Sequence, residues 1–84
     1  MARILYDEIV ILILVIVKVF AQRLKELRQE KNLTQVQLAE QLKFKHYTVI
    51  TQWESGRRMP DIENLVILAQ FFSVTIDYLV GIEK

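Results

Sequence analysis

Four hydrogen-bonding side chains lie close together in the middle of the chain, at Tyr47, Thr48, Thr51 and Gln52. We call them the polar row. Ile50 and Trp53 lie among them, three residues apart, which is the spacing of one apolar face of a helix. If that face is buried, the polar row is left on the opposite side. Hydroxyl and amide groups there can donate and accept hydrogen bonds with the polar groups of a partner.

The sequence contains few of the His and Cys side chains that catalysis and metal binding commonly use. There is a single histidine, His46, and no cysteine. A Cys/His nucleophile pair, a cysteine-based zinc site and disulfides are therefore excluded. We expect no enzymatic activity, no catalytic residue, no metal and no cofactor. The lack of cysteine also fits the reducing cytoplasm, where we expect the protein to be.

Basic residues are concentrated in one part of the chain, although the net charge is only +1. Residues 22–58 contain eight basic and four acidic side chains, a net charge of +4, whereas residues 59–84 carry a net charge of −3. A basic surface around the polar row would attract the phosphate backbone of a nucleic acid. A solvated surface without a partner is the alternative interpretation of the same charges.

Two short helices joined by a turn are predicted to position the polar row. Thr34 and Gln37 have the spacing of a capping box, so a helix is expected to begin at Thr34. Its apolar side chains recur at helical spacing, at Leu38, Ala39 and Leu42. The second helix buries Ile50 and Trp53. Helices this short are not stable alone, so they must pack on each other and on their neighbours.

Several segments follow one another in a characteristic order: RLKELRQEKNLTQ at 23–35, LAEQL at 38–42, WESGRRMP at 53–60, ENLVILAQFF at 63–72 and VTIDYLVG at 74–81. Together they resemble the Cro/repressor (XRE-type) helix-turn-helix family of small bacterial and phage DNA-binding domains. The resemblance covers residues 22–81, about three quarters of the chain. It implies an all-α, five-helix, lambda-repressor-like domain that binds double-stranded DNA as a homodimer and regulates transcription as a repressor.

The resemblance also implies roles for individual residues. A recognition helix enters the major groove and its exposed residues meet base edges, which assigns base contacts to the polar row. Phosphate contacts fall to the start of the first motif helix, the turn and the loop after the second: Thr34, Gln35, Lys45, His46, Arg57 and Arg58. In this family an ion pair commonly ties the first helix to the third, and it maps to Arg23 and Glu54.

The turn between the two motif helices departs from the family pattern. It reads Lys43, Phe44, Lys45, His46, without the usual glycine and one residue longer. With the extra residue placed in the turn, the recognition helix is expected to begin near His46. The polar row contains no Arg or Lys, so the usual guanine contact is missing unless Lys43 or Lys45 supplies it. We expect half-sites rich in A and T, about 34 Å apart.

Three further helices should complete the domain. The first is expected from about Phe20 to Lys31, with Asn32 as a left-handed stop. Asp61 should cap the fourth helix, and Thr75 a last short helix that ends at Gly81. Ser73 stands where the family often has glycine. Four apolar side chains in this C-terminal half are expected to lie partly outside the core and would offer one dimer contact: Phe71, Tyr78, Val80 and Ile82.

Residues 1–19 form an apolar extension before the helix-turn-helix domain of residues 20–84. Residues 9–17 read IVILILVIV, and seven of these nine side chains are β-branched. A bilayer-spanning helix needs about 20 apolar residues, so a membrane partner is not expected. The composition favours a strand, which would pair with a second copy and build a dimer. The alternatives are a helix buried in an assembly, a membrane-surface role, or an extension that the natural protein lacks.

A function from another class competes with DNA binding. A protein-interaction or membrane-peripheral adaptor could keep this fold without reading bases, and both the turn without glycine and the apolar N-terminus would fit it. The affinity for DNA as a function of salt concentration distinguishes the two functions.

Overall fold

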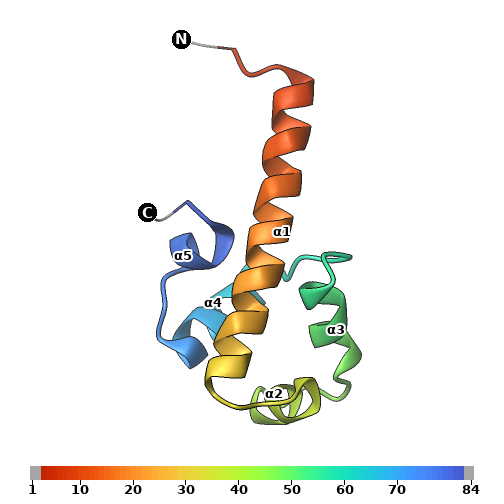
Figure 1. Ribbon diagram of the computed structural model, residues 1–84, viewed down its shortest axis with the longest axis vertical. Coiled ribbons are helices and arrows are strands. Elements are labelled where there is room, and N and C mark those ends of the chain that lie inside the picture. The colour runs from red at the N-terminus through yellow and green to blue at the C-terminus, as the bar shows by residue number, and fades with distance from the viewer. Residues whose placement is uncertain (1–2, 83–84) are drawn as a thin grey trace.

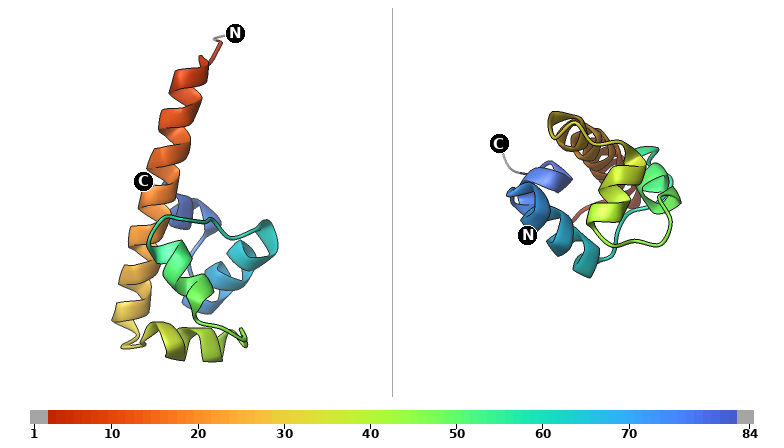
Figure 2. Two further views of the ribbon diagram at one scale, coloured as in Figure 1. Left: turned by 90° about the vertical axis from the view of Figure 1, so that its right-hand side faces the viewer. Right: turned by 90° about the horizontal axis from the view of Figure 1, so that it is seen from below.

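The computed structural model of the protein describes residues 3–82, in which the chain forms five helices and no strand. In chain order the helices are α1 (Tyr6–Glu30), α2 (Gln35–Gln41), α3 (Thr48–Glu54), α4 (Ile62–Phe72) and α5 (Ile76–Val80). The predicted all-α, five-helix fold is confirmed. Helices α2 to α5 gather around the C-terminal half of α1, and its N-terminal half projects beyond them (Figures 1 and 2).

The core lies between α1 and the four shorter helices. Helix α1 packs against α3 and α5, α2 packs against α3, and α4 packs against α5. The larger buried side chains come from every helix: Phe20, Leu24, Leu27, Leu38, Ile50, Trp53, Leu68, Phe72 and Leu79. Helices α2 and α3 have seven residues each, so this shared core supplies the stability that neither has alone.

The predicted caps fix where the short helices begin and end. The Thr34 hydroxyl accepts from the Gln37 N–H at 3.0 Å, and the Thr34 N–H donates to the Gln37 side chain at 2.8 Å. Asp61 caps α4 and Thr75 caps α5, each by accepting a backbone N–H three residues ahead. Asn32 is left-handed, with φ 57°. The predicted stop after α1 is therefore confirmed.

From Tyr6 onward the N-terminal extension is helical, so the predicted dimerisation strand is wrong. Helix α1 begins at Tyr6, not at Phe20, and continues to Glu30 without interruption. The division of the chain after residue 19 therefore falls inside one helix. β-branched residues lower helix propensity only slightly. The first turn of a helix is costly to form, and here the buried C-terminal half of α1 has already formed it. Each residue added to this helix then gains a backbone hydrogen bond, whereas a strand without a partner would leave its backbone groups unpaired.

The apolar face of α1 continues from the core into the projecting half. Side chains at Phe20, Leu24 and Leu27 are buried, and the same alternation of three- and four-residue steps leads back through Val17, Ile13 and Val10 to Tyr6. Val17 and Val10 are half-buried, but Ile13 is 53% exposed. Ile16 is also half-buried, but the remaining side chains of residues 9–15 other than Val10 are exposed, so most of the projecting half lacks the cover that the C-terminal half has.

The four C-terminal side chains expected to lie partly outside the core are exposed to different degrees. Phe71, Tyr78 and Val80 are half-buried, and the first two pack against the core. Only Ile82 of the four predicted side chains is exposed, at 64%. Helix α5 is held on α1 instead, because Arg23 donates to the Tyr78 carbonyl oxygen and its guanidinium lies 4.3 Å from the centre of the Tyr78 ring.

Candidate nucleic-acid interface

Helix α3 is rotated as its sequence predicts. Ile50 is fully buried and Trp53 is 3% exposed, whereas Tyr47, Thr48 and Thr51 are exposed. Gln52, the last member of the polar row, is half-buried. The ring of Phe44, in the preceding turn, packs edge-on against Trp53 with centroids 5.8 Å apart. Burial of one face thus directs the polar row outward, although contact with DNA stays a prediction.

The turn before α3 places a non-glycine residue in a glycine conformation. Lys43 has φ 62°, and the Phe44 N–H donates back to the Ala39 carbonyl oxygen at 2.9 Å. Lys45 and His46 follow as exposed turn residues. Helix α3 then begins at Thr48 with Tyr47 as its N-cap, two residues later than the expected start near His46. The longer connection is absorbed in this turn.

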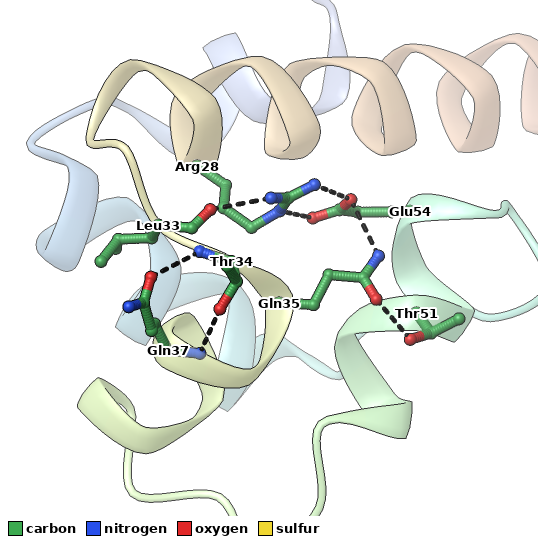
Figure 3. Close-up of polar contacts among 7 residues, drawn as sticks. All are labelled: Arg28, Leu33, Thr34, Gln35, Gln37, Thr51 and Glu54. Carbon is green, nitrogen blue, oxygen red and sulfur yellow. Dashed lines mark hydrogen bonds and ion pairs between the residues drawn. The ribbon is translucent and has the colours of Figure 1, made fainter.

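A chain of hydrogen bonds links helices α1, α2 and α3 and ends at Thr51 of the polar row (Figure 3). The guanidinium of Arg28 donates from Nε to Glu54 Oε2 at 2.7 Å and from Nη2 to Glu54 Oε1 at 2.9 Å. Glu54 Oε1 also accepts from Gln35 Nε2 at 3.2 Å, and Gln35 Oε1 accepts from the Thr51 hydroxyl at 2.7 Å. We call these four residues the α1–α2–α3 brace, because it ties the three helices to one another.

The predicted ion pair between Arg23 and Glu54 is wrong in one partner. Glu54 pairs with Arg28, and the two side chains are only 4% and 12% exposed. Arg23 contacts Tyr78 of α5 instead. Five residues along a helix correspond to rather more than a third of a turn in direction, so the two arginines face different neighbours. Hydrogen bonding to Glu54 raises the pKa of the Arg28 guanidinium, which stays charged at neutral pH.

The predicted phosphate-contact residues occupy three separate places. Lys45 and His46 are exposed in the turn, and Arg57 and Arg58 are exposed in the loop after α3. That loop folds back, because the N–H groups of both arginines donate to the Gln52 carbonyl oxygen, at 3.0 and 3.3 Å. These four side chains have the exposure that a phosphate contact requires, and the contact itself stays a prediction.

Thr34 and Gln35, at the start of α2, are already engaged within the protein. The Thr34 side chain caps α2, and both ends of the Gln35 side-chain amide are part of the brace. Phosphate contact at these two residues also stays a prediction.

Two further residues belong to this surface although sequence reasoning did not select them. Arg28 anchors the brace, and Asn64, in the first turn of α4, borders a shallow groove of about 340 Å³ that Thr48 and Gln52 also line. Asn64 lies twelve residues beyond Gln52 in the chain. No periodic signal in the sequence connects it with α3, because this proximity depends on how α4 packs.

Comparison with known proteins identifies the family to which this arrangement belongs. The model of the helix-turn-helix family matches residues 24–79. The chain belongs to the XRE-type helix-turn-helix family. It is 51% identical over 65 residues to the transcriptional activator BcrR of Enterococcus faecalis, a match that covers 77% of this chain and 31% of BcrR.

Two relatives from Bacillus subtilis strain 168 match the same part of the chain. The transcriptional regulator AnsR is 42% identical over 62 residues, 74% of this chain and 53% of AnsR, and the transcriptional regulator ImmR is 37% identical over 60 residues, 71% of this chain and 46% of ImmR. The chain thus spans about a third to a half of the length of these curated relatives. No solved structure matches it significantly.

The helices and acidic side chains of residues 3–82 bear on two other functions, membrane insertion and metal binding. None of these helices combines the length and the apolar character needed to cross a membrane. That part of the chain also contains no group of three or more His, Cys, Asp or Glu side chains able to hold a metal ion.

Proposed function

We propose that the protein is a sequence-specific, double-stranded DNA-binding regulator of transcription. The observation that carries this proposal is the fixed orientation of α3, with Ile50 and Trp53 buried and the polar row directed outward. A helix held in this way fits the major groove of B-DNA, where base edges present distinct donors and acceptors. The relatives named as transcriptional regulators support the same function.

The chemistry of the polar row favours half-sites rich in A and T. Gln52 can bond to adenine through two hydrogen bonds, Thr48 can contact a base or a thymine methyl group, and Thr51 can hydrogen-bond to a base. Tyr47 can reach a base or a phosphate. The exposed side chains of Lys45, His46, Arg57 and Arg58, with the N-terminus of α2, would fix the register on the phosphate backbone.

The same proposal includes a homodimer built through the projecting half of α1. Six apolar side chains there are between 41% and 60% exposed: Ile9, Ile11, Leu12, Ile13, Leu14 and Val15. Monomeric proteins rarely expose so much contiguous apolar surface. A second copy of the same helix is the occupant that the charges favour, because Asp7 and Glu8 lie at one end of this segment and Lys18 at the other.

An antiparallel arrangement of two α1 helices satisfies these charges and suits a two-fold operator. Centred near Ile13, it brings Asp7 and Glu8 of one copy towards Lys18 of the other. At a rise of about 1.5 Å per residue, Leu24 lies about 17 Å along the helix from that centre, so the two domains would be about 34 Å apart. Successive major-groove half-sites on one face of DNA have this spacing.

The test of DNA binding is fluorescence anisotropy with DNA selected from a random pool, repeated over a series of salt concentrations. Affinity should fall with a log–log slope of about −0.9 for each phosphate neutralised. Arg57→Gln should reduce that slope by about one, whereas Lys31→Gln, which removes a cation placed over the Phe71 ring, should not. Affinity that does not depend on salt would contradict the proposal and favour the adaptor function.

The test of the dimer is sedimentation equilibrium of the Ile11→Glu variant. A charge on the proposed interface should convert the dimer into a monomer, because a buried, unpaired carboxylate costs several kcal/mol. Ile62→Glu is the matched control, since Ile62 is 77% exposed on α4, and it should leave the dimer intact. A native monomer at all concentrations, or a dimer that Ile11→Glu does not change, would contradict this interface.

We further propose that the regulator represses, because a small dimer seated on a promoter blocks access to it. The Enterococcus faecalis relative is named as an activator, so the direction of the effect on transcription needs its own measurement. A reporter gene placed behind the selected operator should fall in expression when the protein is supplied, and a rise would contradict repression. With DNA as its partner in a bacterial cell, the protein would act in the cytoplasm.

A further inference from the structure

The hydrogen bonds of the α1–α2–α3 brace can run in only one direction. A carboxylate only accepts hydrogen bonds, so Glu54 must receive those from Arg28 and from Gln35. The amide of Gln35 therefore turns its NH₂ group towards Glu54. Its carbonyl oxygen must then point the other way, towards Thr51. The opposite orientation would place the carbonyl oxygen of Gln35 against a carboxylate oxygen, two acceptors with no proton between them.

This orientation determines what Thr51 can offer to a partner. The Thr51 hydroxyl lies 2.7 Å from Gln35 Oε1 and must donate its proton to that acceptor. A hydroxyl has a single proton and two acceptor lone pairs. Thr51 is exposed on α3, so what remains available on its outer side is an acceptor and a methyl group. An unbraced threonine would instead rotate to donate or accept as the base requires.

We infer that the brace makes Thr51 an obligate hydrogen-bond acceptor and that it thereby selects the base that Thr51 faces. In the major groove only adenine and cytosine present an amino group, whereas guanine and thymine present acceptors there. Thr51 therefore favours adenine or cytosine on the strand it contacts and disfavours guanine and thymine. Gln35 acts as a positioning residue that sets the specificity without touching the base. The inference rests on the proposed function, because it needs α3 in the major groove.

Two features of the brace keep the orientation of Gln35 stable. Glu54 is held by two hydrogen bonds from Arg28 and its side chain is only 4% exposed, so it cannot swing away from Gln35. Arg28 is held in turn by donating from Nη1 to the Leu33 carbonyl oxygen at 2.8 Å. The acceptor character of Thr51 is thus fixed by residues on two other helices (Figure 3).

The experiment begins with selection of DNA from a random pool by the native chain, followed by anisotropy on four duplexes that differ at one base pair. Thr51→Val identifies the position that Thr51 faces, since preference should be lost there alone. At that position the native chain should prefer adenine or cytosine by roughly 5- to 150-fold. Gln35→Met keeps the side-chain length and removes the acceptor. It should bring guanine or thymine to within a few-fold of the preferred base and leave the other positions unchanged.

Gln41→Met is the matched control, because Gln41 is exposed at the end of the same helix and lies outside the brace. It should change no base preference. If Gln35→Met does not fold, as judged by circular dichroism, native protein is measured on a duplex whose base at that position lacks its amino group. That duplex should lose the native preference.

Three results would overturn the inference while leaving the proposed function in place. They are a native preference for guanine or thymine at the Thr51 position, an unchanged preference in Gln35→Met, and full affinity for the duplex without the amino group. A native chain that shows no salt-dependent DNA binding would overturn the proposed function as well, so the two failures can be told apart.

Discussion

At the scale of single residues, Glu54 is the acceptor that links helices α1, α2 and α3 through its carboxylate. It accepts two hydrogen bonds from Arg28 and one from Gln35, with its side chain almost entirely buried. A nearly buried charge is tolerated when it is paired and becomes costly when its partner is removed. The position of the Thr51 hydroxyl therefore depends, through Gln35, on this one carboxylate.

A double-mutant cycle tests which arginine Glu54 needs. Glu54→Leu should lower the free energy of unfolding by about 3–5 kcal/mol, because Arg28 would be left charged and poorly solvated. Combined with Arg28→Leu, the loss should be smaller than the sum of the two single losses by at least about 0.5 kcal/mol. Urea unfolding gives all the values. Arg23→Leu is the control and should be additive with Glu54→Leu; coupling to Arg23 instead would contradict the observed pairing.

A single backbone conformation accounts for a second prediction at this scale. Lys43 is exposed and left-handed, with φ 62°, in the turn where the family usually has glycine. Lys43→Gly should raise the free energy of unfolding by about 0.5–1 kcal/mol, since glycine adopts this conformation without steric cost. Lys45→Gly, in the same turn but without a positive φ, should lower it. Thermal and urea unfolding check both, and equal effects of the two changes would contradict the explanation.

At the scale of helices, the end of α5 packs so closely against α1 that there is no room for a side chain at Gly81. A Cβ atom on Gly81 would lie 2.7 Å from Val19 Cγ1, and Gly81 also has φ 85°. Gly56 has a similar φ of 78°, but a Cβ there would meet Val17 Cγ1 at an ordinary 3.6 Å. These two glycines separate the cost of the backbone conformation from the cost of the clash.

Both glycines should therefore be replaced by alanine in parallel. Gly56→Ala should lower the free energy of unfolding by about 1–2 kcal/mol through backbone strain alone. Gly81→Ala should lower it by a further 1–3 kcal/mol or so, because the new methyl group overpacks the contact with α1. Urea unfolding measures the difference. Val19→Ala should rescue Gly81→Ala and not Gly56→Ala; equal losses in the two glycine variants would show that the contact with Val19 is looser than described.

The helices also show which features periodicity and capping rules can predict. The caps at Thr34, Asp61 and Thr75 were predictable, since each depends on residues three apart. The helical state of residues 6–19 was not, because β-branched composition favours a strand when a segment is considered alone. In the molecule this segment continues a helix that the core has already formed, and that continuity outweighs local preference.

At the scale of the whole molecule, the elongated shape is the property that a sequence-based prediction misses. The principal extents are 45, 23 and 21 Å, and the long one follows α1. The outward direction of the polar row was predictable from the burial of Ile50 and Trp53. The brace was not, because it requires the relative rotation of three helices to be known. The dimer proposed here depends on the elongated shape, since the projecting helices would hold the two domains a groove repeat apart.

Amide hydrogen exchange in the projecting half of α1 should also measure dimer formation. The backbone hydrogen bonds of this half are all made within the helix, yet no other helix shields them, so in a lone protomer they should open by fraying and exchange their amide protons with solvent quickly. Amides near Leu24 and Leu27, inside the core, should exchange slowly in every state. Protection of residues 9–17 that rises with protein concentration would therefore report, turn by turn, how much of the helix a second copy covers.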